Sequence, residues 1–276
     1  MFFRLYPPAA PLRSFVQHYL VAHVRTADGL PVPAPAPKPQ PPTPNQFLFF
    51  YPRDEVRSFH YGQARELRSP RSILVGPQVS RVDLSFAADH LVVCVAFRPG
   101  GLHRLLGVPV KELFDFALDS RAALGPAVDE VADRLAELTD YDQMVAVVES
   151  YLLRAARHAL PPARLLDALL PHLLGNWAAQ PLEQLAHEVC LSPRQFERSF
   201  LERVGMGPKL HARIVRFDQA FRLKERQPGL DWLAVAVQVG YYDYRHLVRD
   251  FKAFAGVTPP PLLAADARHT RLALAG

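Results

Sequence analysis

The sequence is poor in cysteine: Cys94 and Cys190 are the only two among 276 residues. Two thiols are too few for a disulfide framework or a thiolate metal site. No stretch approaches the roughly 18 uncharged apolar residues of a membrane span, and the opening Met-Phe-Phe-Arg does not resemble a signal peptide. These absences predict a protein of the reducing cytoplasm that has no membrane association.

Apolar residues make up 49% of the sequence and charged residues 21%, which excludes a wholly disordered or fibrous chain. The length predicts two domains. The net charge of +5 is unevenly spread: residues 1–163 hold 17 basic and 16 acidic side chains, and residues 164–276 hold 15 and 11. A basic C-terminal part is compatible with an anionic partner, although a solvated surface explains this excess equally well.

The first hundred residues have the pattern of a β-rich domain. Eight prolines between residues 31 and 44 predict an extended surface loop, with a ligand for an SH3-like partner as the alternative. Short β-branched or aromatic segments lie at residues 47–51, 72–75, 82–86 and 91–97. Their regular spacing predicts an antiparallel barrel or sandwich in residues 1–104.

Residues 105–160 have a helical pattern instead. Apolar side chains recur at spacings of three and four within residues 126–138 and again within 140–160, so each segment is expected to form an amphipathic helix. The two helices either cover the sheet or form a dimer seam, and we expect chains to pair through them. Two consecutive prolines from residue 161 mark the expected domain boundary.

The most informative feature is an internal repeat in the last hundred residues. An F-x4-G-x2-P unit begins at Phe200 and again at Phe251. Upstream of it, Ala186 and Cys190 correspond to Ala236 and Gly240. A small residue permits a close helix crossing, and a glycine four residues later permits a left-handed turn. The repeat therefore predicts two helix-turn-helix units, whose second helices are seated by Phe196 and Phe200 and by Leu247 and Phe251.

Cys190 stands where the second unit has glycine, and a left-handed residue other than glycine costs about 1–2 kcal/mol. The first turn is therefore expected either to be strained or to take another geometry. We interpret Cys190 as a small buried hydrophobic residue, with a redox sensor as the alternative.

One long helix is expected to join the two units. Residues 208–225 form an uninterrupted helical pattern that starts at Pro208 and stops before a Pro-Gly pair. Such a helix spans roughly 27 Å, while successive major grooves on one face of B-DNA lie about 34 Å apart. The duplication therefore suits a protein that reads two successive grooves.

Residues 181–260 resemble the C-terminal DNA-binding domain of the AraC-type (arabinose-regulator) transcription factors. The match is strongest at residues 240–252, followed by residues 256–259. The resemblance implies an all-α DNA-binding domain over residues 161–267, followed by a tail at 268–276. Residues 96–109 resemble the sensor half of a subgroup of these regulators, which implies a cupin-like sensor domain and an overall α+β fold.

In such domains the second helix of each unit enters the major groove of double-stranded DNA. Ser192 and Asp243 are expected to cap these two helices. Side chains on the side opposite the buried phenylalanines are expected to face bases, and the resemblance makes Arg249 the best candidate. The expected base-facing residues are Arg194, Gln195, Glu197, Arg198, Tyr244, Arg245, Val248 and Arg249. The residues expected at phosphates or at the groove edge are Ser192, His246 and Lys252.

No metal or cofactor is expected in the N-terminal half. His60, His90 and His103 stand alone, without the His-x-His pair with which many cupins hold a metal. We therefore predict a regulator, not an enzyme, that responds to a small-molecule effector. The alternatives are an N-terminal half that only dimerises or binds another protein, and a cupin-type enzyme fused to a DNA-binding domain. Contact with RNA polymerase and association with the nucleoid are implied by the resemblance alone.

Overall fold

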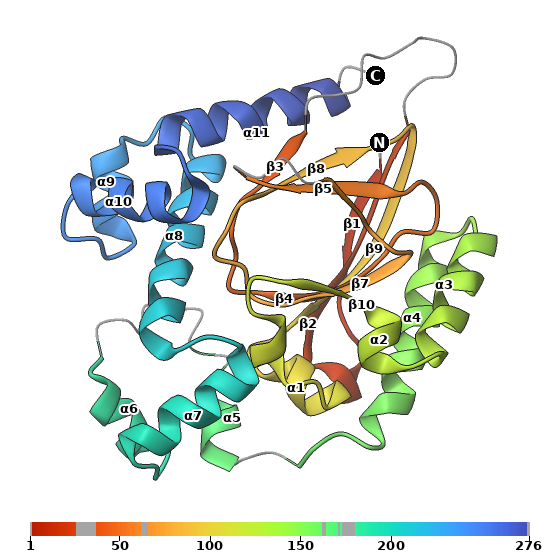
Figure 1. Cartoon of the computed structure of the whole chain (residues 1–276), viewed down its shortest axis with the longest axis horizontal. Coiled ribbons are helices and arrows are strands. Elements are labelled where there is room, and N and C mark those ends of the chain that lie inside the picture. Colours follow the sequence, from red (N-terminus) through yellow and green to blue (C-terminus); the bar gives the residue numbers. More distant parts are fainter. Residues whose placement is uncertain are drawn as a thin grey trace.

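The computed structural model describes residues 2–25, 37–61, 66–161, 164–170, 172 and 180–274, and it does not describe the side chains of residue 164 and residues 267–274. The chain forms a two-sheet N-terminal half and an all-helical C-terminal domain (Figure 1). The expected α+β fold is therefore confirmed. No helix in the described ranges is long and apolar enough to cross a membrane.

Every strand in the described ranges belongs to one of two antiparallel sheets. The strands are β1 (Phe2–Tyr6), β2 (Val16–Arg25), β3 (Lys38–Gln40), β4 (Gln46–Phe50), β5 (Val56–His60), β6 (Glu66–Arg68), β7 (Ser72–Val75), β8 (Val82–Phe86), β9 (Asp89–Phe97) and β10 (Ala117–Asp119). One sheet has the order β1-β2-β9-β4-β7-β10, and the other has the order β3-β8-β5-β6. The four segments expected to be strands are confirmed as β4, β7, β8 and β9.

The larger sheet is covered on both faces because its strands alternate two sets of apolar side chains. One set, which includes Leu48, Phe50 and Val95, packs beneath helices in the main hydrophobic cluster. The other set, which includes Ile73 and Val75, packs with Val56 of the smaller sheet in a second cluster. The two sheets therefore form a sandwich, one of the two arrangements expected.

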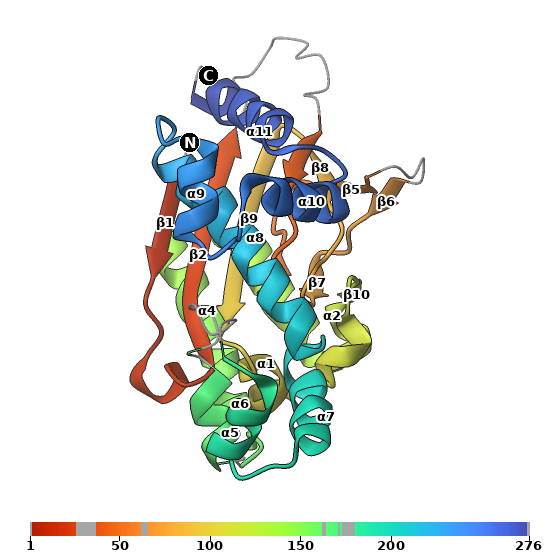
Figure 2. The ribbon, with the colours of Figure 1, turned by 90° about the vertical axis from the view of Figure 1, so that its left-hand side faces the viewer.

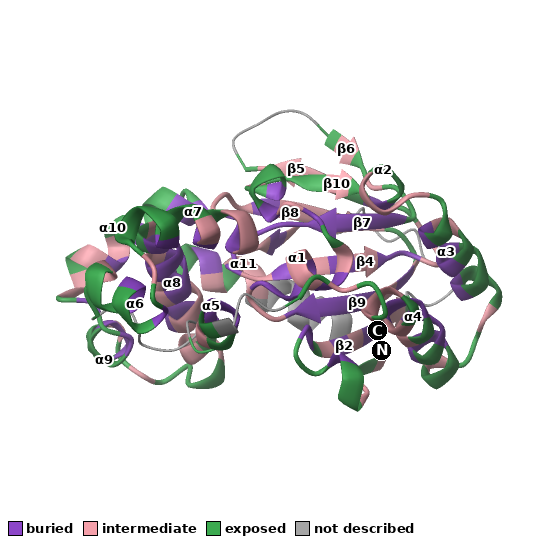
Figure 3. Cartoon of the chain, turned by 90° about the horizontal axis from the view of Figure 1, so that it is seen from below, coloured by how far each residue is buried: buried purple, intermediate pink, exposed green. Residues whose placement is uncertain are grey.

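Helices close the outer face of this sheet. They are α1 (Gly101–Leu106), α2 (Ser120–Leu124), α3 (Ala127–Glu137) and α4 (Tyr141–Ala156), with short 3-10 helices η1 (Ala10–Leu12) and η2 (Val110–Leu113). The apolar stripes of α3 and α4 are buried within the chain, and their outer sides are exposed and largely polar (Figure 3). Of the two roles considered for these helices, the apolar stripes serve to cover the sheet. Pairing of chains through the outer sides of the helices stays a prediction.

The proline-rich segment also differs from the surface loop that we expected. Residues 31–36 lie outside the described ranges, but Lys38–Gln40 forms strand β3 and Pro39, Pro41, Pro42 and Pro44 are buried. Proline is tolerated in β3 because this strand is at the edge of its sheet, where one row of backbone groups needs no partner. Helix α11 (Pro259–Leu274) packs against this strand (Figure 1).

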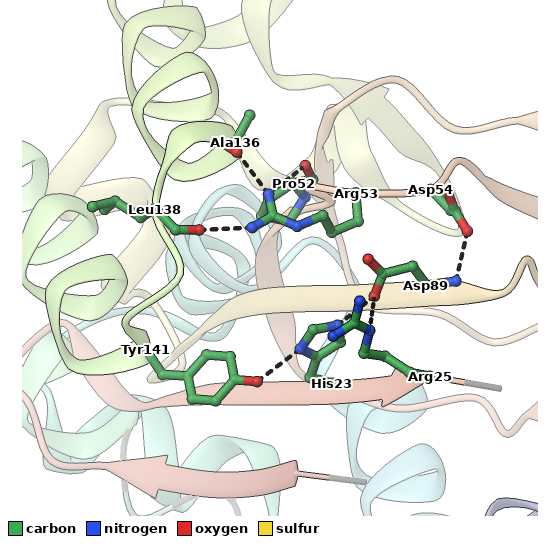
Figure 4. A network of polar contacts seen from close by, with 9 residues as sticks. All are labelled: His23, Arg25, Pro52, Arg53, Asp54, Asp89, Ala136, Leu138 and Tyr141. Atoms are coloured by element: carbon green, nitrogen blue, oxygen red, sulfur yellow. Dashed lines mark hydrogen bonds and ion pairs between the residues drawn. The ribbon is translucent and has the colours of Figure 1, made fainter. Parts of the chain in front are cut away.

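A polar network joins the sheet to the helical layer of the N-terminal half (Figure 4). His23 Nδ1 lies 2.8 Å from the Tyr141 hydroxyl, and His23 Nε2 lies 2.5 Å from Asp89 Oδ1. Arg53 donates to the carbonyls of Ala136 and Leu138, each at 2.7 Å. The hydrogen bond from His23 lowers the pKa of Asp89 below its usual value. The network therefore attaches strands β2 and β9 to the start of α4.

The three histidines that we considered for a metal site are not gathered. No group of three or more His, Cys, Asp or Glu side chains that could hold a metal occurs in the described part of the chain. His90 is buried beside Phe86, with the ring centroids 4.1 Å apart, and burial lowers its pKa to about 4. His90 therefore belongs to the packing of the sandwich.

The C-terminal domain consists of helices around one apolar core. They are α5 (Arg164–Leu169), α6 (Leu182–Glu188), α7 (Pro193–Val204), α8 (Pro208–Arg226), α9 (Trp232–Gln238), α10 (Tyr244–Ala255) and α11. The long helix predicted from Pro208 is confirmed as α8. In its core, Phe217 packs on Phe251 with ring centroids 4.6 Å apart.

One expected boundary falls inside a helix, and one segment expected to be helical contains a strand. Helix α11 runs past residue 267, so the tail expected from residue 268 begins within a helix. The expected helical segment at residues 105–160 also contains strand β10, which pairs with β7. A strand of three residues is too short to produce a periodic pattern in the sequence.

Candidate nucleic-acid interface

The two helix pairs of the C-terminal domain close through the same backbone hydrogen bond. The amide of Leu191 donates to the carbonyl of Ala186 at 2.9 Å, and the amide of Tyr241 donates to that of Ala236 at 2.9 Å. Both alanines are fully buried at the helix crossings. Helices α6 and α7, and helices α9 and α10, are therefore two helix-turn-helix units of the same construction. They lie at the two ends of α8 (Figure 2).

The turn of the first unit is left-handed despite its cysteine. Cys190 has a φ of 57°, and Gly240 in the second unit has a φ of 84°. Cys190 therefore takes the strained form of the turn that we considered. The interpretation of Cys190 as a buried residue is wrong, because its side chain is exposed.

Helix α7 begins with a complete capping box. The Ser192 hydroxyl accepts from the amide of Gln195, while Gln195 Oε1 accepts from the amide of Ser192 at 3.0 Å. Phe196 and Phe200 are fully buried against the domain core. After Pro193, the exposed side chains of the first two turns are Arg194, Gln195, Glu197 and Arg198. Of these, Gln195 already uses its carbonyl in the cap.

Helix α10 is capped by Asp243, whose carboxylate accepts from the amide of His246 at 2.7 Å. Both predicted caps are thus confirmed. Leu247 and Phe251 are fully buried. On α10, the exposed residues among those predicted to meet DNA are Arg245, Arg249 and Lys252.

Three other residues predicted to meet DNA are half-buried. Tyr244 packs against the domain core, and the His246 ring stands edge-on to Tyr241 with centroids 5.2 Å apart. Val248 is half-buried as well. These three side chains therefore contribute to the packing of the domain, and their contacts with DNA stay predictions.

The exposed arginines of the two helices share an electrostatic property. Most arginines elsewhere in the described ranges form an ion pair or a hydrogen bond with the protein, as Arg213 does with Asp250. Among the described residues, no ion pair forms at the four on these helices: Arg194, Arg198, Arg245 and Arg249. Their charges therefore stay available for an external anion.

Helix α10 is anchored to α8 by a buried carboxylate. Asp250 accepts from Arg213 Nη2 at 2.7 Å and from the Tyr241 hydroxyl at 3.2 Å, and its side chain is 2% exposed. Burial raises the pKa of Tyr241. This anchor was not among the features predicted from the sequence. The available signal was a charged residue between Leu247 and Phe251, on the apolar stripe of the helix.

Helix α7 is anchored differently, to the N-terminal half. The Gln46 side-chain amide donates to the carbonyls of Arg203 and Val204 at 3.3 and 3.4 Å. Asp167 accepts from Arg203 Nε at 3.2 Å and pairs with Arg104 Nε of α1 at 3.7 Å. We call these contacts the α7 clasp. They hold the C-terminal end of α7, while its N-terminal turns remain exposed.

Comparisons with known proteins agree with this architecture. The model of a helix-turn-helix domain matches residues 185–263, and that of a domain of unknown function (DUF6597) matches residues 4–119. An uncharacterized HTH-type transcriptional regulator of Haemophilus influenzae is 27% identical over 227 residues, which cover 77% of this chain and 76% of that protein.

Among solved structures, ToxT from Vibrio cholerae O395 aligns with a TM-score of 0.44 and 13% identity, over 92% of this chain and 98% of that one. ToxT of strain SCE256 bound to an unsaturated fatty acid aligns with a TM-score of 0.44 and 12% identity, over 89% and 94%. The duplicated helix-turn-helix units and the matched domain give the same identity: the chain is a transcription regulator whose C-terminal domain is a helix-turn-helix domain of the AraC type.

Proposed function

We propose that this protein binds double-stranded DNA sequence-specifically, with α7 and α10 in two successive major grooves. The observation that carries the proposal is the pair of capped helices that each present exposed arginines without ion pairs on the side opposite their buried phenylalanines. Helix α8 has 19 residues and so spans about 28 Å between the units. Arg245 and Arg249 are well suited to guanine, which accepts two hydrogen bonds from a guanidinium group in the major groove.

Replacing Arg249 with alanine tests the base-reading role. Arg249→Ala is expected to weaken binding to a cognate site by about 1–3 kcal/mol and to relax the preference at one base pair. Affinity is measured by fluorescence anisotropy on a site selected from random duplexes and on its single-base variants. Arg134→Ala, at an exposed position on α3, is the matched control. A loss that is equal on all sequences would make Arg249 a phosphate contact.

We propose further that the N-terminal half responds to a small-molecule effector. The α7 clasp supports this proposal, because it connects the sandwich and α1 to a helix that reads DNA. An effector that shifts the N-terminal half therefore has a direct route to the first unit. Contact with RNA polymerase and a place on the nucleoid in the cytoplasm remain proposals that rest on the resemblance to AraC-type regulators. Homodimerisation through the outer sides of α3 and α4 remains a proposal as well.

Replacing Asp167 with alanine tests this route. Metabolites that raise the melting temperature of the wild type are first selected, and DNA affinity is then measured with and without each compound. In Asp167→Ala the compound is expected to keep its thermal shift but to lose most of its effect on DNA affinity, because Arg104 and Arg203 lose their shared carboxylate. An unchanged effect would exclude the clasp as the route. If no compound alters DNA affinity, the alternative of an N-terminal half that only dimerises or binds protein is favoured.

A further inference from the structure

The two helix-turn-helix units differ in length by one residue. Ala186 and Ala236 are 50 positions apart, whereas the caps Ser192 and Asp243 are 51 apart. The second turn therefore contains one more residue than the first. The matching hydrogen bonds from Leu191 and Tyr241 to the two alanines place it after Tyr241. The additional residue is Tyr242.

Tyr242 lies between two anchored residues, while its own side chain is exposed. Its neighbour Tyr241 is 4% exposed and bonded to Asp250, and Asp243 on the other side caps α10. Between them the Tyr242 side chain is 91% exposed, the highest value among the large exposed apolar residues of the described ranges. An aromatic ring in water contributes little to folding, because the favourable term comes from its burial.

The place of Tyr242 in the unit determines what it meets. In a helix-turn-helix the first helix crosses the DNA backbone, and the N-terminal residues of the second contact base edges in the groove. A side chain between the two helices lies where the backbone borders the groove. Tyrosine is among the side chains that hydrogen-bond to phosphates, and such contacts fix the register of the protein on the duplex.

We propose that Tyr242 contacts the sugar–phosphate backbone at the edge of the groove read by α10, with its ring on a deoxyribose and its hydroxyl donating to a phosphate oxygen. This rests on the proposed reading of DNA by α10. The contact belongs to the second unit alone, because the first unit passes directly from Leu191 to its cap and has no counterpart. The ion pair between Asp250 and Arg213 fixes α10 to α8, and so fixes the backbone position from which the Tyr242 side chain extends.

The test uses the full chain and a duplex selected with the wild type. Tyr242→Ala is expected to weaken binding about tenfold and Tyr242→Phe about threefold, the latter being the value of one hydrogen bond. Neither change should alter the preference for any base pair or the dependence on salt, since a neutral hydroxyl displaces no counterion. Phe3→Ala, at an aromatic position of the N-terminal half that is 60% exposed, is the control and should bind as the wild type does.

Methylphosphonate substitution of single phosphates locates the contact. One substitution in the half-site of α10 is expected to weaken the wild type and to have no additional effect on Tyr242→Phe. If Tyr242→Ala binds within twofold of the wild type while Arg249→Ala is weakened, the proposed contact is wrong and the DNA-reading function stands. A lost preference at one base pair in Tyr242→Ala would also overturn it, in favour of base readout. A wild type that selects no sequence would overturn the proposed function itself.

Discussion

Replacing Arg213 with methionine is expected to lower the free energy of unfolding of the C-terminal domain by about 3–5 kcal/mol. The substitution keeps an apolar stem beside the Phe254 ring, above which the guanidinium group lies at 5.1 Å. It leaves the carboxylate of Asp250, 2% exposed, without its cation. The loss is measured by urea unfolding, with amide hydrogen exchange in α8 and α10 to assign it to this domain.

Removing the negative charge of the same ion pair is expected to lower the free energy of unfolding by less. In Asp250→Asn the remaining charge belongs to Arg213, whose side chain is 42% exposed and so stays hydrated. A loss of about 1–2 kcal/mol is expected, typical of weakened hydrogen bonds to a charged group. A larger loss in Asp250→Asn than in Arg213→Met would contradict this assignment.

Acid is expected to destabilise the C-terminal domain through His211. This side chain is fully buried at the start of α8, where its ring lies 5.4 Å from that of Phe200, and burial lowers its pKa from 6.5 to about 3. The unfolded chain therefore binds a proton below pH 6.5 that the folded chain does not. Proton binding by the unfolded chain therefore lowers the free energy of unfolding as the pH falls below 6.5. The loss is about 2 kcal/mol between pH 7 and pH 5.

His211→Leu should remove this part of the pH dependence. The measurement is the free energy of unfolding at pH 7, 6 and 5, again with hydrogen exchange in α8. The wild type should lose stability across this range in both halves, since His90 in the sandwich has a pKa of about 4 for the same reason. In the variant only the N-terminal half should do so. Parallel pH profiles for the wild type and the variant would show that His211 does not titrate as its burial predicts.

Local features of this protein could be predicted because the groups that produce them are close in the sequence. Ser192 and Asp243 cap helices through amides three residues away, and α8 starts at its proline. The repeat predicted two helix-turn-helix units before any contact was known. For the interface, Arg194, Glu197, Arg198, Arg245 and Arg249 could be chosen because each helix turns its phenylalanines inward.

Other choices could not be made from the sequence, because they depend on segments that are distant in the chain. The stripes of α3 and α4 are equally suited to a sheet or to a second chain, and periodicity does not distinguish these partners. The buried prolines at residues 39–44 were mistaken for a solvated loop because a short edge strand has no pattern of its own. In both cases the choice depends on what lies opposite in the folded chain.

The sequence by itself determined the two helix-turn-helix units, their caps and their outward arginines, because turns and helix ends are decided within a few residues. Only the tertiary structure decided how each reading helix is held. Helix α10 is fixed within its own domain by Asp250 and Arg213, which are 37 positions apart, and α7 is fixed to the N-terminal half by Gln46, which donates to a carbonyl 157 positions away. Such contacts form because folding brings faces together, and a single sequence does not state which faces meet.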